Sequence, residues 1–482
     1  MKCSFKGSVI ATSLALALAA PAAQATNGYF KIGYGSKARA MAGVSTAYPR
    51  DSLAGVANPA NLAFVGNRVD AGVELFNPRR DARLDARGMG GADTGKVDSG
   101  ATLFAVPHAG FSMQLAGPLT VGLSIAANGG MNTRYNSNLY FNALGPAINA
   151  SVAALTSGPY SGNANDVAAI RGMASVLASD PYASIQTLGV NLAQVIIAPT
   201  VAYKITPHQS IGACLQIGYQ RFRAYGLGMF KAFSSDPAHV TNQGDDDAWG
   251  SGVRLGWTGQ LTDKLTLGVA GATKIYMQRF KKYQGLFAER GDFDVPANYS
   301  VGLAYQATPK LKVAADVQRI LYSDVKSIGN PGPTAAEFIR GFQAVLTSRT
   351  SDHGARLGGP TVAKPLGTDG GWGFGWNDIT VVKVGFEYDY DKRWTFMGGI
   401  NHGGNPIDNK ESLFNILAPG VVKTHATVGV TYSPDGAREI TVAYMHAFRE
   451  DVGFDYAAMS QKYRAEAGMD QNALEISYGW KF

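Results

Sequence analysis

Residues 119–126 read LTVGLSIA, and their side chains alternate between two kinds. The odd-numbered positions hold Leu, Val, Leu and Ile, whereas the even-numbered positions hold Thr, Gly, Ser and Ala. Successive side chains of a β-strand point to opposite faces of its sheet. The stretch therefore predicts a strand with one apolar face and one small or polar face.

The same alternation returns in 299–306 (YSVGLAYQ), 382–389 (VKVGFEYD) and 425–432 (HATVGVTY). Strands in a bilayer must satisfy their backbone groups from neighbouring strands, and only a closed sheet does so without leaving edges. One face of such a sheet meets lipid and the other meets the lumen, so apolar and polar residues must alternate. The sequence therefore predicts an all-β protein, a transmembrane antiparallel β-barrel.

We count fourteen such strands, and their connections alternate between short turns and long loops. Short periplasmic turns opposite long outer loops are typical of outer-membrane barrels. Only 165–179 and 334–346 read as helical patches, and the two largest loops span about 134–189 and 327–376. The strands are predicted to start near residues 67, 104, 119, 190, 209, 248, 264, 295, 311, 378, 393, 421, 438 and 471, with short turns at 116–118, 206–208, 262–264, 308–310, 389–392 and 433–436.

The last nine residues, 474–482, read LEISYGWKF and alternate in the same way. Their apolar side is rich in aromatic residues, which fits the girdle at a membrane interface. Trp480 and the terminal Phe482 also resemble the assembly signal of outer-membrane barrels in general. That resemblance implies recognition by the barrel-assembly machinery.

The N-terminus predicts export. Lys2 and Lys6 precede an apolar run over 9–20, and Ala23-Gln24-Ala25 has the small-x-small form of a signal-peptidase site. A twelve-residue run at ~1.5 Å per residue cannot cross ~30 Å of hydrocarbon, which argues against a membrane anchor. We expect 1–25 to be a cleaved signal peptide, cut after Ala25, and the mature chain to lie in a bacterial outer membrane.

Residues 26–66 show no strand alternation and are rich in Gly, Ala and Ser. They still carry too many apolar residues for a solvated tether, among them Tyr29, Phe30 and Ile32. Fourteen strands enclose more space than their own side chains can fill. We therefore predict that 26–66 folds into the lumen as a hatch, and that 67–482 forms the barrel.

Other classes of function find little support. The net charge of +7 is too mild, and the basic residues too scattered, to indicate nucleic-acid binding. Neither G-x-S-x-G nor H-E-x-x-H occurs, and His425 or His446 is better read as a lumenal or interface residue than as a catalytic one. Asp245-Asp246-Asp247 lacks the ligand spacing of a Ca²⁺ loop. We expect a monomer that is not an enzyme and has no metal or cofactor; Cys214 is the one cysteine of the mature chain.

The run 33–43 (GYGSKARAMAG), followed by Asp51 and Asn58-Pro59-Ala60, resembles the N-terminal hatch of FadL-type outer-membrane transporters. The resemblance continues in the family's order through 294–299 (DVPANY), 376–378 (WND), 394–400 (WTFMGGI) and 444–446 (YMH).

This resemblance implies uptake of hydrophobic molecules, which outer loops capture, a lumenal pocket holds and a gap at a kink in the third strand releases sideways. By position, Asn128-Gly129-Gly130 matches that kink, although an ordinary strand end is the alternative. Asn58, Pro59 and Ala60 become hatch or gating residues beside the gap. Tyr29 and Phe30 become candidates for the ligand pocket.

The ligand itself stays open between long-chain fatty acids or related lipids and neutral aromatic or aliphatic hydrocarbons. Fatty-acid-transporting members have basic pocket residues, but Gly226 and a residue near Phe374 stand at those positions here. Arg221 and Arg223 are the candidates to replace them. A general porin is the remaining alternative, and it would not need the segment 26–66.

Two outer segments complete the predictions. The apolar residues of 135–155 form either a capture surface or a self-packed lid. Residues 279–283 (RFKKY) either meet phosphates of lipopolysaccharide, which together with outer-membrane lipid is an expected partner, or form a solvated strand end.

Overall fold

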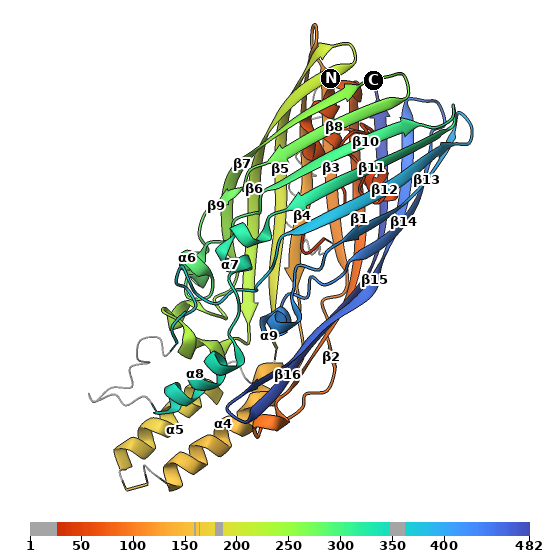
Figure 1. Cartoon of the computed structure of the whole chain (residues 1–482). Coiled ribbons are helices and arrows are strands. Elements are labelled where there is room, and N and C mark those ends of the chain that lie inside the picture. Colours follow the sequence, from red (N-terminus) through yellow and green to blue (C-terminus); the bar gives the residue numbers. More distant parts are fainter. Residues whose placement is uncertain (1–26, 159–160, 163, 179–186, 348–361) are drawn as a thin grey trace.

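The computed structural model describes residues 27–158, 161–162, 164–178, 187–347 and 362–482. Its body is one antiparallel sheet that closes on itself as a tilted barrel (Figure 1). The closed path has 14 strands, and the two-residue strands β2 and β9 lie beside it. The strands are β1 (Arg68–Asp85), β2 (Val97–Asp98), β3 (Phe104–Gln114), β4 (Leu119–Asn132), β5 (Gly189–Thr206), β6 (Gln209–Tyr225), β7 (Asp246–Gln260), β8 (Leu265–Ala272), β9 (Tyr276–Met277), β10 (Asn298–Gln306), β11 (Leu311–Ile320), β12 (Ile379–Asp389), β13 (Trp394–Gly403), β14 (Thr424–Tyr432), β15 (Arg438–Ala458) and β16 (Gln461–Lys481).

The barrel closes where the first strand meets the last. β1 pairs with β16 along its whole length, from Arg68 opposite Lys481 to Asp85 opposite Arg464. On its other side β1 pairs with β3. Every strand of the path pairs with two neighbours, so the sheet closes into a barrel.

The outer surface of the wall is apolar, as the alternation predicts. On β10 the side chains of Tyr299 and Val301 are 54% and 55% exposed, whereas those of Asn298 and Ser300 are buried. The exposed residues face outward and the buried ones face the lumen. This division is the one that a bilayer imposes on a barrel.

The predicted strand starts agree with the structure within three residues, except at the last strand. β16 begins at Gln461 and not near 471, and Met459 and Ser460 join it to β15 in a tight turn with positive φ angles of 51° and 64°. The expected long loop is therefore a long hairpin. Its outer part carries ion pairs such as Arg464–Asp455 in place of an apolar face, so the alternation test missed it.

The long loops fold into helices at one end of the barrel (Figure 1). The patches predicted at 165–179 and 334–346 are α5 and α8, but α4 was missed because Gly145, Pro146 and an uncharged composition argued against a helix. No helix among the described residues combines the length and apolar composition needed to cross a membrane. The helices of the outer and connecting segments are α4 (Leu139–Ser157), α5 (Ala164–Ala178), α6 (Ala288–Gly291), α7 (Lys326–Gly329), α8 (Ala335–Thr347), α9 (Ser412–Asn415), η2 (Arg87–Met89), η4 (Gly228–Phe233), η5 (Pro237–His239), η6 (Lys281–Tyr283), η7 (Tyr322–Asp324) and η8 (Asn409–Glu411).

Residues 27–66 pack inside the barrel, and we call this segment the hatch. It contains α2 (Ser36–Ala40), α3 (Ala54–Ala57) and η1 (Pro59–Phe64). α2 contacts β13 to β16, whereas η1 contacts β4 to β7, so the hatch spans the lumen between opposite walls. The predicted signal peptide, 1–25, lies outside the described residues.

Candidate functional site

The wall of the barrel is interrupted between β3 and β4. β4 pairs with β3 only from Thr120 to Ile125, but it pairs with β5 as far as Asn132. The register with β5 shifts between Ala127 and Gly129, which leaves Asn128 as the extra residue of a β-bulge. The predicted kink residues therefore form a bulge at the point where one ladder of the wall ends.

Around and beyond this bulge β4 is buried on both faces. Every residue of 124–133 is buried, whereas a strand in the wall would show alternate side chains to lipid. The facing part of β3, 104–108, stays paired with β1. The two sides meet again further out, where the amide of Gly100 donates to the carbonyl of Arg134 at 2.8 Å. We call the unpaired stretch between 104–108 and 126–132 the wall break.

The hatch is bonded to the wall break. The amide of Lys31 donates to the carbonyl of Asn128 at 2.8 Å, and the hydroxyl of Tyr34 donates to the side-chain oxygen of Asn128 at 2.6 Å. Phe30 pairs with Gly129 as an isolated β-bridge. Ile32 packs with Phe104, Val106 and Ala127, so the inner side of the break is apolar.

Tyr29 and Phe30 lie in the interior, 0% and 3% exposed. The Tyr29 ring centroid is 5.4 Å from that of Tyr322 and 5.9 Å from that of Trp376. The Tyr322 hydroxyl also accepts the amide of Tyr29 at 3.2 Å. The start of the hatch is therefore held in an aromatic cluster directly inside the wall break.

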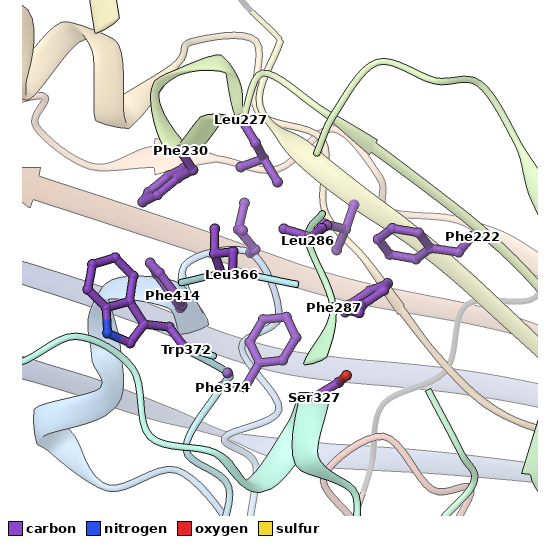
Figure 2. Close-up of a pocket in the computed structure, with 13 residues that line it drawn as sticks. Phe222, Leu227, Phe230, Leu286, Phe287, Ser327, Leu366, Trp372, Phe374 and Phe414 are labelled. Atoms are coloured by element: carbon purple, nitrogen blue, oxygen red, sulfur yellow. The ribbon is translucent and has the colours of Figure 1, made fainter. Parts of the chain in front are cut away.

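An apolar cavity lies on the outer side of this cluster (Figure 2), and about 490 Å³ of atom-free space, part of it open to solvent, lies within its walls. It is lined by side chains from β5, β6 and several outer loops. Among the described residues, no lining side chain carries a charge, and polar side-chain atoms come only from the Ser327 hydroxyl and the Trp372 indole. The lining residues are Val190, Phe222, Leu227, Phe230, Leu286, Phe287, Ser327, Leu366, Trp372, Gly373, Phe374, Phe414 and Leu417.

Two aromatic contacts connect the cavity to the hatch. The ring centroid of Phe287 lies 4.8 Å from that of Phe293. The Phe293 centroid in turn lies 6.4 Å from that of Tyr29. On another side, Phe374 lies 6.5 Å from Trp376. Continuous apolar packing therefore runs from the cavity to Tyr29 and the wall break.

A second, open hollow lies between α4 and α8, and we call it the outer groove. It measures about 1080 Å³ and is lined mainly by apolar side chains. The apolar residues predicted in 135–155 divide between this groove and the packed interior, because Tyr135, Leu139 and Tyr140 are buried. The groove is lined by Met89, Leu144, Ala147, Ile148, Ser151, Ala154, Leu155, Ile339, Phe342 and Gln461.

Ion pairs fasten the hatch to the wall. Lys31 and Arg39 of the hatch both lie 2.7 Å from Glu74 of β1, and Arg39 lies 3.3 Å from Glu475 of β16. These four side chains are at most 1% exposed. Arg50 pairs with Glu387 of β12 in the same manner.

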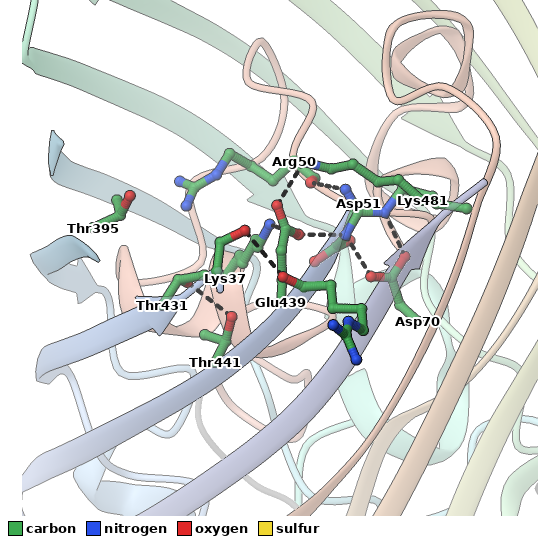
Figure 3. A network of polar contacts seen from close by, with 12 residues as sticks. Lys37, Arg50, Asp51, Asp70, Thr395, Thr431, Glu439, Thr441 and Lys481 are labelled. Carbon is green, nitrogen blue, oxygen red and sulfur yellow. Dashed lines mark hydrogen bonds and ion pairs between the residues drawn. The ribbon is translucent and has the colours of Figure 1, made fainter. Parts of the chain in front are cut away.

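A second group of charged residues is less buried and lies nearer the short turns. Figure 3 shows its polar contacts. Glu439 of β15 accepts from Lys37, Arg68 and Lys481 at 2.5, 2.9 and 2.6 Å. Asp70 accepts the amide of Ser52 at 2.9 Å. A polar hollow at the periplasmic end, of about 1410 Å³ and open to solvent, is bordered by Lys37, Arg68, Glu439 and Lys481, so water reaches the hatch from that side.

A carboxyl of the outer loops also has an altered pKa. Burial, followed by the nearby carboxylates of Asp294 and Glu289, raises the pKa of Asp292 to about 6. The backbone carbonyl of Asp292 accepts the hydroxyl of Ser327 at 2.5 Å. The backbone of Asp292 therefore contacts Ser327, a residue of the cavity lining.

The structure places three predicted residues away from the gap. Asn58 donates to the carbonyls of Thr46 and Trp257 at 2.7 and 3.1 Å, and the carbonyl of Ala60 accepts the hydroxyl of Ser210 at 2.8 Å. Asn58, Pro59 and Ala60 thus anchor the hatch to β6 and β7, and their expected place beside the gap is wrong.

Two predicted pocket residues lie on the outer surface. On β6 the buried Gln220, Phe222 and Ala224 face inward, so Arg221 and Arg223 face outward by alternation. Arg221 lies 2.8 Å from Asp247, and Arg223 lies 3.5 Å from Asp245. Neither arginine lines the cavity.

The sequence reasoning missed most cavity residues, because they come from loops without periodicity. Their signal was present in the unusual apolar content of outer connections such as 226–233 (GLGMFKAF). Trp480 and Phe482 are each 42% exposed on the outer surface, where an interface girdle is expected. Among the described residues, no three His, Cys, Asp or Glu side chains gather as metal ligands would.

Several solved structures have the same fold as this chain. The Pseudomonas putida toluene transporter TodX superposes with a TM-score of 0.60 at 21% identity, over 95% of this chain and 100% of that one. A FadL homologue of Pseudomonas aeruginosa gives 0.62 at 15% identity, over 94% and 100%. The Ralstonia pickettii toluene transporter TbuX gives 0.54 at 18% identity, over 94% and 99%. At these identities the likeness shows the fold alone.

No curated protein sequence matches the chain significantly. A family model does match it over residues 163–482, more than half of its length, and its description is outer membrane protein transport protein (OMPP1/FadL/TodX). The members of this family are transport channels and not enzymes. The chain therefore belongs to the OMPP1/FadL/TodX family and is an outer-membrane transporter of hydrophobic compounds.

Proposed function

We propose that this protein takes up neutral hydrophobic compounds, with aromatic hydrocarbons as the preferred class. The observation that carries the proposal is the lining of the cavity, which includes no charged side chain and six aromatic ones. Aromatic rings pack favourably edge to face with one another, so such walls suit a small aromatic solute.

A fatty acid is a poorer fit to this cavity. Its carboxylate would lose water without gaining a cation, because burying an unpaired charge is costly. By resemblance, a residue near Phe374 takes the place of a basic residue of the fatty-acid-transporting members, and Phe374 lies in the cavity wall. Arg221 and Arg223 cannot compensate, since both face outward.

The proposed route follows the apolar surfaces in order. The outer groove beside Leu144, Ile148 and Phe342 captures the solute, and the cavity holds it. The aromatic cluster around Tyr29 then leads to the wall break. Lateral release is favoured because exposing roughly 250 Å² of apolar surface to periplasmic water would cost about 6 kcal/mol at ~25 cal/mol per Å². The packed, ion-paired hatch argues against a general porin.

A binding experiment tests the ligand class. Purified protein in detergent is titrated with radiolabelled toluene and, separately, with oleate, between pH 5.5 and 8.5. We expect the protein to bind toluene more tightly than oleate, with an affinity for toluene that does not change with pH.

A pair of variants at Phe374 sharpens the test. Phe374→Arg should lower toluene affinity and create oleate binding, whereas the size-matched control Phe374→Leu should keep the preference for toluene. Tight oleate binding by the unchanged protein, together with weak toluene binding, would assign the channel to fatty acids instead.

A further inference from the structure

The outer face of β6 changes character toward the long-loop end. Its outward side chains are first apolar, with Ile211 and Leu215 48% and 46% exposed. They reach an aromatic pair, Tyr219 with Trp249, whose ring centroids are 4.9 Å apart. Aromatic girdles mark the edge of the hydrocarbon layer. The next outward residues, including Arg223, therefore stand at the level of the outer-leaflet headgroups.

A groove lies at this level on the outside of the barrel. It measures about 880 Å³ and brings Arg134, Arg223 and Tyr225 together. Both guanidinium groups are close enough to the Tyr225 phenol to interact with it electrostatically. The groove is lined by Arg134, Thr187, Arg223, Ala224, Tyr225, Gly226, Asn242 and Gly244.

The two arginines of the groove are weakly neutralised. Arg223 stands 3.5 Å from Asp245, whereas the neighbouring Arg221 is in full contact with Asp247 at 2.8 Å. In the part of the chain that the structure describes, no carboxylate forms an ion pair with Arg134. Each guanidinium is a planar fork of donors that matches phosphate oxygens, and two such groups with a phenol line this groove.

The groove also has a definite place relative to the wall break. Arg134 follows β4 by two residues, and the side chains of Asn132 and Asn191 are hydrogen-bonded just beneath it. A lipid held at Arg134 would extend its acyl chains downward from the headgroup level along the outside of the break.

We propose that this groove binds a phosphate group of an outer-leaflet lipid, whose acyl chains then cover the outer side of the wall break. Basic residues at a membrane surface attract anionic headgroups. The bound lipid would be the first hydrocarbon that a released solute meets. This assignment does not depend on which solute the cavity holds.

The test measures lipid binding to the intact protein by native mass spectrometry in detergent. The probes are lipid A with both phosphates, the same lipid after enzymatic dephosphorylation, and inorganic phosphate. The variants are Arg134→Gln, Arg223→Gln and the double variant. The control, Arg438→Gln, removes the same charge from an exposed arginine on a periplasmic turn. Retained heat-modifiable migration in electrophoresis confirms that each variant barrel has folded.

We expect the double variant to bind bisphosphorylated lipid A at least about tenfold more weakly, since each surface arginine adds to headgroup attraction. Dephosphorylated lipid should bind the unchanged protein equally poorly, and Arg438→Gln should bind as the unchanged protein does. Full binding of dephosphorylated lipid, or full affinity in the double variant, would overturn the site. Displacement of lipid A by millimolar inorganic phosphate would reassign it to the free ion.

Discussion

The carbonyl oxygen of Tyr29 lies 1.9 Å from the point that a Cβ atom at Gly129 would occupy. Only glycine therefore fits at this position of β4 while the hatch keeps its place. The contact joins the start of the hatch to the bulge. Together with the hydrogen bond from the Lys31 amide to the Asn128 carbonyl, it holds the hatch against the wall break.

Replacing Gly129 by alanine should reduce uptake at least tenfold, because the added Cβ must displace either the hatch backbone or the bulge. Barrel assembly should be unaffected, since the pairing of β4 with β5 continues on both sides. Uptake of radiolabelled toluene by whole cells measures the effect. The control is Gly271→Ala, whose Cβ would meet its nearest neighbour at an ordinary 3.8 Å. Normal uptake by the Gly129 variant would rule out release at this site.

Arg39→Leu should loosen the hatch. The change removes a cation shared by Glu74 and Glu475, and breaking a buried ion pair commonly costs about 3–5 kcal/mol. We expect faster amide hydrogen exchange in 36–44, measured by mass spectrometry. Adding Glu475→Gln should restore part of the protection, because it removes the carboxylate left without its partner. Unchanged exchange in the single variant would show that packing alone holds the hatch.

Deleting residues 27–57 should turn a closed channel into a cation-selective pore. Four lumenal glutamates, at positions 74, 387, 439 and 475, pair with hatch cations and would lose those partners. The reversal potential of single channels in a KCl gradient reports the selectivity. The intact protein should show no large, steady conductance, and such a conductance would refute the plug. An anion-selective deletion variant would instead show that other lumenal charges dominate.

The loop around Asp292 should become less stable between about pH 4 and pH 6. In the folded loop the pKa of the Asp292 carboxyl is raised from the ordinary 3.8 to about 6. The carboxyl therefore holds its proton more tightly in the folded loop than in the unfolded one. The stabilisation is complete below pH 4, falls as the pH rises and is lost above pH 6. Hydrogen exchange of 286–297 at pH 4 and pH 7 measures it. Asp292→Asn should remove the pH dependence, and a loop that became more stable on going to pH 7 would contradict the raised pKa.

The membrane part of the barrel could be predicted because contact with lipid requires apolar and polar residues to alternate within each strand. Alternation located the start of β4 to the residue and that of β10 within three residues. The family resemblance, and not alternation, predicted a kink at Asn128-Gly129-Gly130, where β4 has a bulge. Where the same strands extend beyond the bilayer, apolar and polar residues no longer need to alternate. The outer part of β16 is charged, and its start was predicted ten residues late.

The cavity could not be predicted in the same way. Its residues, such as Phe230, Trp372 and Phe414, come from loops whose contacts depend on the whole fold and on no local period. The resemblance made Arg223 a candidate pocket residue, and this prediction was wrong. Side chains alternate along β6, and the position of Arg223 in that alternation puts it on the outer face. Asn58 lies in the segment that packs inside the barrel, but no feature of the sequence indicated which strands it would contact.

Glu74 and Glu475 stand opposite each other on the two strands that close the barrel. Bringing two carboxylates together in a dry lumen is unfavourable unless cations arrive with them. Lys31 and Arg39 supply those cations, and they belong to the segment that leads into β1. We therefore expect insertion of the hatch to be coupled to the pairing of the last strand with the first during biogenesis. A chain without the two cations is expected to close its barrel more slowly.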